Sequence, residues 1–312
     1  MTHQFLREPA LFPARMAGET WGSERCDVEL AGELFRIEGL SSLQLRGLAE
    51  RYGARLQPSH ATNVAATLQV FRAPVSDFVE IDTRGWEYWV DLQWSESGFA
   101  LSGMRVMARA ELDRAGIWTS VEEPAEFSGV VENVLRPLLA ARLLANGGLL
   151  VHSAAADGYL FAGRSGAGKS TVARLALDAG RAVLSDDLNA IMRVDASAER
   201  RRGTPALPSG FLLEPLPFTG DLEERETSRT QTRLRAILAL EKSDAESVRA
   251  MSLADTVSLL VRCAPYVNQD PARLPLLLER ASEIAHGTRR GVIAFRRDGD
   301  VWPILDAGFG SR

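Results

Sequence analysis

The sequence has only two cysteines, Cys26 and Cys263, among its 312 residues, and no CxxC spacing. This scarcity argues against a disulfide framework and a structural zinc site, so two buried or incidental thiols are expected. It also lacks an excess of positive charge, because 36 Lys and Arg residues stand against 41 Asp and Glu residues, a net charge of −5. Nucleic acid is therefore not an expected partner.

Long hydrophobic runs are also missing, since no stretch of about 18 apolar residues occurs. The nearest candidate, LRPLLAARLLANGGLLV, is interrupted by Arg136, Arg142 and Asn146. Charged residues, Pro9 and Pro13 break up the N-terminal segment, which does not resemble a secretory signal. A cytoplasmic protein with no membrane span is the expectation.

Residues 1–115 predict a small α+β domain with an antiparallel sheet. Segments rich in Val, Phe, Trp and Tyr predict strands at residues 26–32, 33–40, 66–73, 77–82, 87–94 and 99–108. One helix is expected between them, over residues 41–53, with Gly53 as its C-terminal cap. No pattern typical of catalysis occurs in this part of the chain.

Residues 116–126 predict a connection, and residues 127–312 a second domain. A strongly apolar helix is expected to open this domain, ending near Gly147, with Pro137 predicted to kink or break it. From Gly148 onward, strands and helices alternate, which indicates an α/β nucleotide-binding domain.

The most specific motif is a complete phosphate-binding loop, G-x-x-x-x-G-K-[ST]. It comprises Gly163, Arg164, Ser165, Gly166, Ala167, Gly168, Lys169 and Ser170, and the nucleotide-binding stretch extends to Thr171. The glycines allow backbone N–H groups to surround phosphate oxygens, and a helix beginning near Lys169 directs its positive end at the same anion. Lys169 can reach the terminal phosphates, and Ser170 can ligate Mg²⁺.

Two adjacent aspartates, Asp186 and Asp187, follow the next short strand, which should return toward the loop. One carboxylate could help to hold Mg²⁺ while the other accepts a proton from an incoming hydroxyl. A solvent-exposed acid pair after a strand is the structural alternative. His152 lies on a predicted hairpin, turning at Asp157-Gly158, that leads into the loop, where it could bond to an aspartate or serve only as a structural side chain.

Together, the histidine before the loop, the GxSGxGKS sequence and the Asp-Asp pair resemble the catalytic domain of HPr kinase/phosphorylase, a bacterial serine kinase. A more distant similarity is to ATP-dependent phosphoenolpyruvate carboxykinase. The resemblance covers residues 148–195 and implies a P-loop kinase domain with a mixed sheet, which uses Mg²⁺ and ATP. It implies Asp186 as general base, His152 as its support, and Ser170 with Asp187 at the metal.

The chain departs from the family downstream, where the expected glutamate before Arg-Gly is absent. Glu199 and Glu214 are the alternatives for completing the metal site, and the reverse phosphorylase reaction is left open. The first domain does not match the family's N-terminal domain, so HPr itself is not the expected acceptor.

The sequence thus predicts an ATP-dependent kinase acting on a hydroxyl, first of all a serine of a peptide or protein such as a biosynthetic precursor peptide. A small-metabolite kinase and a nucleotide-binding regulator without turnover are the alternatives. A transport ATPase is disfavoured because no LSGGQ-like motif occurs. The presence of a homo-oligomer is left open.

Overall fold

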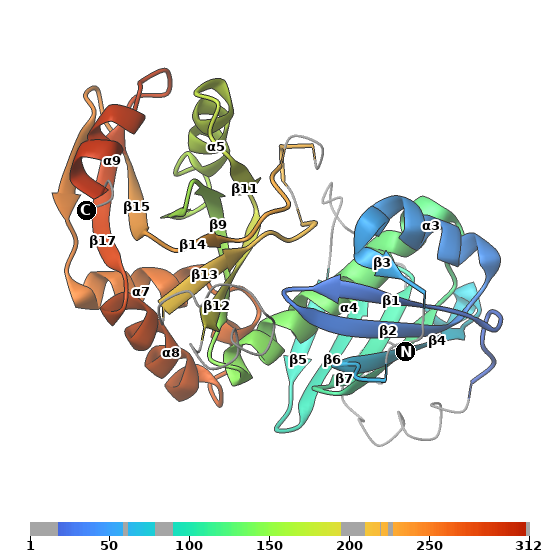
Figure 1. The fold of residues 1–312 in the computed structure, drawn as a ribbon. Coiled ribbons are helices and arrows are strands. Elements are labelled where there is room, and N and C mark those ends of the chain that lie inside the picture. The colour runs from blue at the N-terminus through green and yellow to red at the C-terminus, as the bar shows by residue number, and fades with distance from the viewer. Residues whose placement is uncertain are drawn as a thin grey trace. The chain divides into compact units, whose positions relative to one another are not determined.

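The protein is of mixed α/β class, and its computed structural model describes residues 18–58, 62–78, 90–194, 210–218, 220–223 and 227–309. It divides into two compact units, Met1–Leu139 and Ala140–Arg312, each with its own mixed sheet (Figure 1). The boundary between the units falls inside the long helix α4, Pro124–Ala145.

In the first unit, the described strands form one curled sheet in the order β3-β1-β2-β4-β8-β7-β6-β5 (Figure 1). These strands are β1 (Glu24–Leu30), β2 (Glu33–Leu40), β3 (Leu56–Gln57), β4 (Ala66–Arg72), β5 (Val90–Trp94), β6 (Gly98–Gly103), β7 (Val106–Glu111) and β8 (Arg114–Thr119). Helix α3 (Ser42–Tyr52) and the short 3-10 turns η1 (Gly53–Arg55) and η2 (Val75–Asp77) complete the regular elements before α4.

The antiparallel sheet expected for this unit is a mixed sheet, because β4 pairs in parallel with both of its neighbours, β2 and β8. The chain forms α3 between β2 and β4, and a crossover of this kind brings two strands into parallel alignment. Short turns join β5, β6, β7 and β8, so these strands pair antiparallel.

Helix α3 follows its predicted signals. Ser41 and Gln44 form a reciprocal capping box at its start, and Gly53 caps its end as expected. The predicted strand at 99–108 is wrong as a single element, because the chain turns at Arg105, whose φ is 56°, and separates β6 from β7. Most of the predicted strand at 77–82 lies outside the described residues.

The connection expected at residues 116–126 is shorter in the structure. Strand β8 extends to Thr119, and α4 begins at Pro124, where a proline fits the first helical turn because its missing N–H would have no partner there. The predicted break at Pro137 does not occur, since α4 continues through it to Ala145.

The described strands of the second unit form a sheet in the order β14-β13-β12-β9-β10-β15-β17-β16, with β11 paired to β9. They are β9 (Leu149–Ala156), β10 (Tyr159–Ala162), β11 (Val183–Ser185), β12 (Leu188–Val194), β13 (Gly210–Glu214), β14 (Thr232–Arg233), β15 (Ala236–Lys242), β16 (Ser247–Ala250) and β17 (Arg289–Phe295). The helices are α5 (Lys169–Asp178), α7 (Leu253–Cys263), α8 (Leu274–His286) and α9 (Trp302–Phe309), with the 3-10 turn η4 (Val267–Gln269).

The predicted hairpin that leads to the phosphate loop is confirmed. Strands β9 and β10 pair antiparallel around Asp157 and Gly158, whose φ angles of 55° and 84° suit a two-residue hairpin turn. Arg181 holds this turn to α9, because its guanidinium donates to Asp157 Oδ2 at 2.8 Å and to Asp306 Oδ2 at 2.6 Å.

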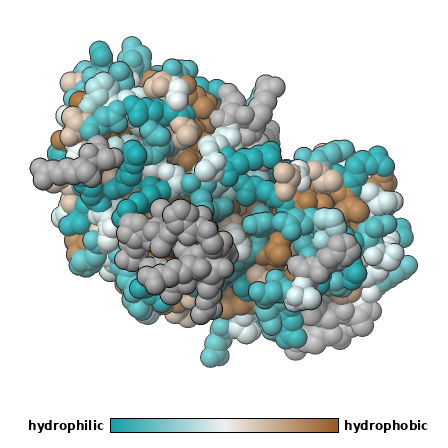
Figure 2. Space-filling model, in the orientation of Figure 1, coloured by the Kyte–Doolittle hydropathy of each residue, from teal (hydrophilic) through white to brown (hydrophobic). Residues whose placement is uncertain are grey.

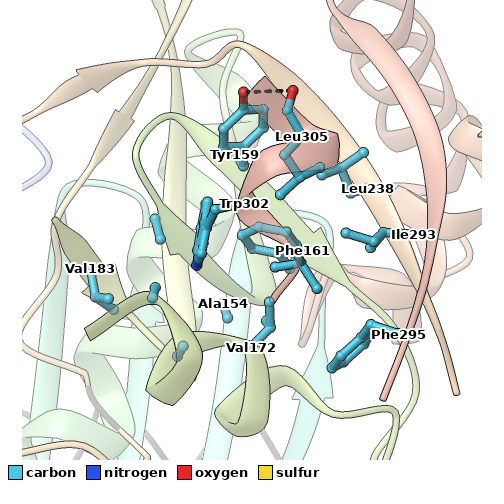
Figure 3. Close-up of a cluster of buried hydrophobic side chains, with 14 of the residues drawn as sticks. Ala154, Tyr159, Phe161, Val172, Val183, Leu238, Ile293, Phe295, Trp302 and Leu305 are labelled. Carbon is cyan, nitrogen blue, oxygen red and sulfur yellow. Dashed lines mark hydrogen bonds between the residues drawn. The ribbon is translucent and has the colours of Figure 1, made fainter. Parts of the chain in front are cut away.

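The strand before the phosphate loop and the helix after it contribute to one buried aromatic and aliphatic cluster (Figure 3). Val172 on α5 packs against it together with Phe161 of β10 and Trp302 of α9. The buried Tyr159 hydroxyl donates to the Leu305 carbonyl oxygen at 3.4 Å. The loop is therefore fixed at both of its ends by elements that share one core.

Both cysteines are buried and free, as expected, and burial raises the pKa of the Cys26 thiol to about 12. Hydrophilic residues dominate the visible face of the molecule, with hydrophobic residues scattered between them (Figure 2). Within the described part of the chain, no helix has the length and apolarity needed to cross a membrane.

Candidate active site

The phosphate loop lies between β10 and α5, at one edge of the second sheet. Strand β10 runs parallel to β15, and β15 runs parallel to β17, so the carboxyl ends of all three meet at this edge. In open α/β sheets this edge is where ligands bind. Helix α5 begins at Lys169, and no side chain caps its first turn, so its N-terminal N–H groups suit an anion.

Two glycines of the loop have positive φ angles, 75° at Gly166 and 107° at Gly168. A Cβ at Gly168 would lie 2.9 Å from Cζ of the buried Phe295 ring, whereas a Cβ at Gly166 would meet no atom within 4 Å. Glycine is therefore needed at position 168 both because its φ is positive and because Phe295 leaves no room for a Cβ. At position 166 it is needed only because its φ is positive.

We expect Gly168→Ala to destabilise the protein more than Gly166→Ala. Both substitutions incur about 1–2 kcal/mol of left-handed backbone strain. Only the first adds overpacking against Phe295, which costs about 1–3 kcal/mol more. Urea denaturation of both variants measures the difference, and equal free energies of unfolding would contradict the packing role of Gly168.

Lys169 is buried, as a phosphate-binding lysine at the base of a cavity should be. Its Nζ donates to the carbonyl oxygens of Gly163 and Arg164, each at 3.3 Å. Burial lowers the pKa of the Lys169 ammonium from its usual 10.5, and the nearby Cys263, Asp187 and Asp186 oppose this shift. A phosphate anion would compensate the charge at the same point.

A phosphate anion binds the protonated form of Lys169 more tightly than the neutral form. The affinity for nucleotide should therefore decrease as the pH rises in the alkaline range. Below the lowered pKa, Lys169 is already protonated and binding needs no proton; above it, binding must take one up. We expect the affinity for Mg·ADP to fall as pH rises through a window that lies below 10.5. Titrations between pH 7 and 10 measure it, with Lys169→Arg as a control, since arginine stays protonated throughout.

Asp186 and Asp187 follow β11, as predicted, and their surroundings differ. Asp186 is only 3% exposed, and both of its carboxylate oxygens accept backbone N–H groups. Oδ1 accepts from Gly220 at 2.9 Å and Oδ2 accepts from Asp221 at 3.0 Å. Asp186 therefore holds the 220–221 segment beside the aspartate pair, an anchoring role that the sequence did not reveal.

Asp187 is the more accessible carboxylate, with 23% of its side chain exposed. Nε2 of His152 lies 3.8 Å from Asp187 Oδ1. The resemblance implied that His152 supports Asp186, but the acid beside its imidazole is Asp187. The backbone of Asp187 is also fixed, since its carbonyl oxygen accepts the Ser153 N–H at 2.9 Å.

These groups line one cavity of about 610 Å³. Its lining includes the predicted residues His152, Ser165, Gly166, Ala167, Gly168, Lys169, Ser170, Thr171, Asp186 and Asp187. Gly163 and Arg164 lie outside this cavity and contact it through their carbonyl bonds to Lys169. The sheet thus brings the loop, the acid pair and the histidine together.

Six further lining residues were not predicted. They are Gly220, Asp221, Lys242, Ser243, Phe295 and Arg297. Lys242 ends β15 and Phe295 ends β17, so both follow from the parallel order of these strands with β10. Their only sequence signal was a place at the carboxyl end of a strand, which becomes informative only once the strand order is known.

The donor set near Ser170 fits Mg²⁺. Among the described residues, no three His, Cys, Asp or Glu side chains gather closely enough to hold a metal ion on their own. Mg²⁺ needs fewer, because it is usually held by one or two carboxylates together with water and substrate phosphates. Glu214 does not line the cavity, and Glu199 lies outside the described residues.

Comparison with known proteins adds no relative: no family model matches this chain, and no curated protein matches it.

Proposed function

We propose that the protein is a kinase that transfers the γ-phosphate of ATP to a hydroxyl group, in a P-loop domain of the HPr-kinase type. One observation carries the proposal. The phosphate-loop residues from Ser165 onward, among them the buried Lys169, line the same cavity as the two aspartates that follow β11. A surface acid pair, the structural alternative, would not have one aspartate that is 3% exposed and bonded through both oxygens.

The nucleotide would lie along the loop. Backbone N–H groups of residues 165–170 and the start of α5 would surround the phosphates, while Lys169 would exchange its two carbonyl contacts for phosphate oxygens. Lys242 ends β15, and Arg297 lies just beyond β17. Both would add positive charge along the cavity wall.

Asp186 would act as general base. The acceptor oxygen would attack the γ-phosphorus while the bond to the β,γ-bridging oxygen breaks, leaving ADP, and the hydroxyl proton would pass to the carboxylate. Two backbone N–H groups already orient this carboxylate, which favours a fixed geometry at the moment of transfer. Each oxygen keeps a second lone pair for the proton.

Ser170 and Asp187 would hold Mg²⁺, and His152 would orient Asp187 from 3.8 Å. The ion would neutralise charge on the β- and γ-phosphates. The proximity of Asp187 to His152 favours an alternative, in which Asp187 and not Asp186 accepts the proton. Experiment can distinguish Asp187 as a Mg²⁺ ligand from Asp187 as the general base. Asp187→Asn should raise the Mg²⁺ concentration needed for transfer if Asp187 holds the ion, and should leave it unchanged if Asp187 is the base.

The acceptor is best found by transfer from γ-labelled ATP into an extract of the native host. We propose a serine of a peptide or protein as the acceptor, with a small metabolite as the alternative, so the labelled products are separated by size. A large or peptide-sized product supports the first class, and a small organic phosphate supports the second. Tight ATP binding that releases only free phosphate would contradict a kinase and favour a nucleotide-dependent regulator.

A further inference from the structure

A second cavity, of about 580 Å³, opens at the other end of the phosphate loop. It shares His152, Ser165, Ala167 and Lys169 with the first cavity. Unlike the first cavity, it is also lined by Gly163 and Arg164, where the loop begins, and by residues of α7 and η4. Asn268 fixes this wall, since its side-chain amide donates to the carbonyl oxygens of Val261 and Arg262, in the last turn of α7, each at 3.3 Å.

The order of the phosphates along the loop indicates which part of a bound nucleotide would lie near each cavity. In a loop of this kind, backbone N–H groups surround the earlier phosphates, and the lysine reaches the terminal ones. Ser170 and Thr171 of α5 line only the first cavity, whereas Ser165 and Lys169 line both. An acceptor that attacks in line must approach the γ-phosphate opposite the departing ADP. The second cavity meets the first at Lys169, the residue that reaches the terminal phosphates, so a group bound there would lie on the γ-phosphate side of the loop.

The charge of the second cavity differs from that of the first. Arg164, Lys169 and Arg262 line it, and none of its described lining residues is an aspartate or glutamate. The first cavity contains three aspartates, and the whole chain has a net charge of −5. A wall of cations without acids, in an acidic protein, indicates an anionic ligand.

Arg262 is the cation most available for a ligand. It lies in the last turn of α7, is exposed, and forms no ion pair with another residue in the described ranges. Lys169 is already assigned to phosphate, and Arg164 lies on the loop itself, beside the transferring group. A planar guanidinium suits carboxylate or phosphate, which it can bind through two parallel N–H bonds.

We propose that this second cavity binds the acceptor through a carboxylate or phosphate group that the acceptor carries near its hydroxyl, paired with Arg262. The hydroxyl itself would extend past Ser165 and Lys169, which line both cavities, toward Asp186 in the first cavity. The inference rests on the proposed phosphotransfer. Leu240, Leu259 and Pro265 would contact the carbon skeleton of the same molecule. A small hydroxy acid and an acidic peptide share this chemistry, and they are separated by the choice of probes.

The test measures equilibrium binding to the full chain loaded with Mg·ADP. The probes are glycerate and two serine-centred pentapeptides, one flanked by aspartates and one by lysines. At least one anionic probe should bind about tenfold more tightly than the lysine peptide, since a charge-assisted bond contributes about 1.5–3 kcal/mol. The preference should weaken with added salt. Whichever of glycerate and the aspartate peptide binds more tightly indicates whether the acceptor is a small hydroxy acid or an acidic peptide.

Arg262→Gln should weaken the anionic probe about tenfold and leave Mg·ADP affinity unchanged. The matched control is Arg249→Gln, an exposed arginine of the same unit that pairs with Glu241 and lines neither cavity. It should leave both affinities unchanged. Equal binding of the acidic and basic peptides, no binding of either anion, or an Arg262→Gln variant with wild-type anion affinity would each overturn the inference.

The anion site and the kinase activity can be contradicted independently of each other. Anion binding that needs Arg262, in a protein that transfers no phosphate, would contradict the kinase and retain the anion site. Phosphate transfer that prefers lysine-flanked serines would retain the kinase and contradict the anionic acceptor.

Discussion

Lys169→Ala should weaken Mg·ADP and Mg·ATP binding at least about 100-fold, because two charge-assisted contacts to phosphate, each about 1.5–3 kcal/mol, are lost together. The fold should survive. Burial disfavours the charged form of this lysine, as its lowered pKa indicates, so removing the ammonium relieves an unfavourable charge. Isothermal titration with each nucleotide measures the affinity, and thermal unfolding measures the stability.

Lys242→Ala is the matched control for this substitution. Lys242 lines the same cavity but is exposed, so its contribution should be that of a surface charge, a factor of about five at most. Equal losses in the two variants would mean that net charge alone attracts the nucleotide. Full affinity in Lys169→Ala would contradict phosphate binding by the loop.

Asp186→Asn should bind Mg·ATP with near wild-type affinity and transfer phosphate about 100- to 10,000-fold more slowly, the range for loss of a general base. The substitution also has a structural effect. An asparagine amide group would face the N–H of either Gly220 or Asp221, and an unpaired buried donor costs about 1–3 kcal/mol. Slower transfer could then result from a loosened segment.

Ser185→Ala separates these two causes. The Ser185 hydroxyl is buried, donates to the Phe218 carbonyl oxygen at 2.8 Å and accepts the Asp187 N–H at 3.1 Å, so it holds this segment and the backbone of the acid pair without supplying a carboxylate. We expect Ser185→Ala to lower the melting temperature as Asp186→Asn does, yet to keep most of the transfer rate. A similar loss of transfer in both variants would mean that loosening the segment and the acid pair, and not removal of the Asp186 carboxylate, slows transfer, which would contradict Asp186 as the base.

The sequence predicted the local part of the site well. The phosphate loop, the hairpin at Asp157-Gly158 and the strand before Asp186 each depend on neighbours in the chain, and each lies where expected. Left-handed turn positions and helix starts are encoded within a few residues, so a single motif determines them.

Features that depend on distant pairing were not predictable. Nothing near Asp186 indicates that Gly220 and Asp221 donate to its oxygens, because the segment that carries them is far along the chain. The parallel pairs of β4 in the first sheet were missed for the same reason, since strand residues favour pairing without specifying a partner. The second cavity likewise exists only after α7 packs beside the loop.

The most direct test of the central claim is single-turnover transfer from γ-labelled ATP with Mg²⁺ into native-host extract, comparing wild type with Asp186→Asn at equal nucleotide occupancy. We expect a labelled organic product with wild type and at least about a 100-fold slower appearance of it with the variant. Identical rates in the two proteins, or label found only in free phosphate, would contradict a kinase that uses this aspartate.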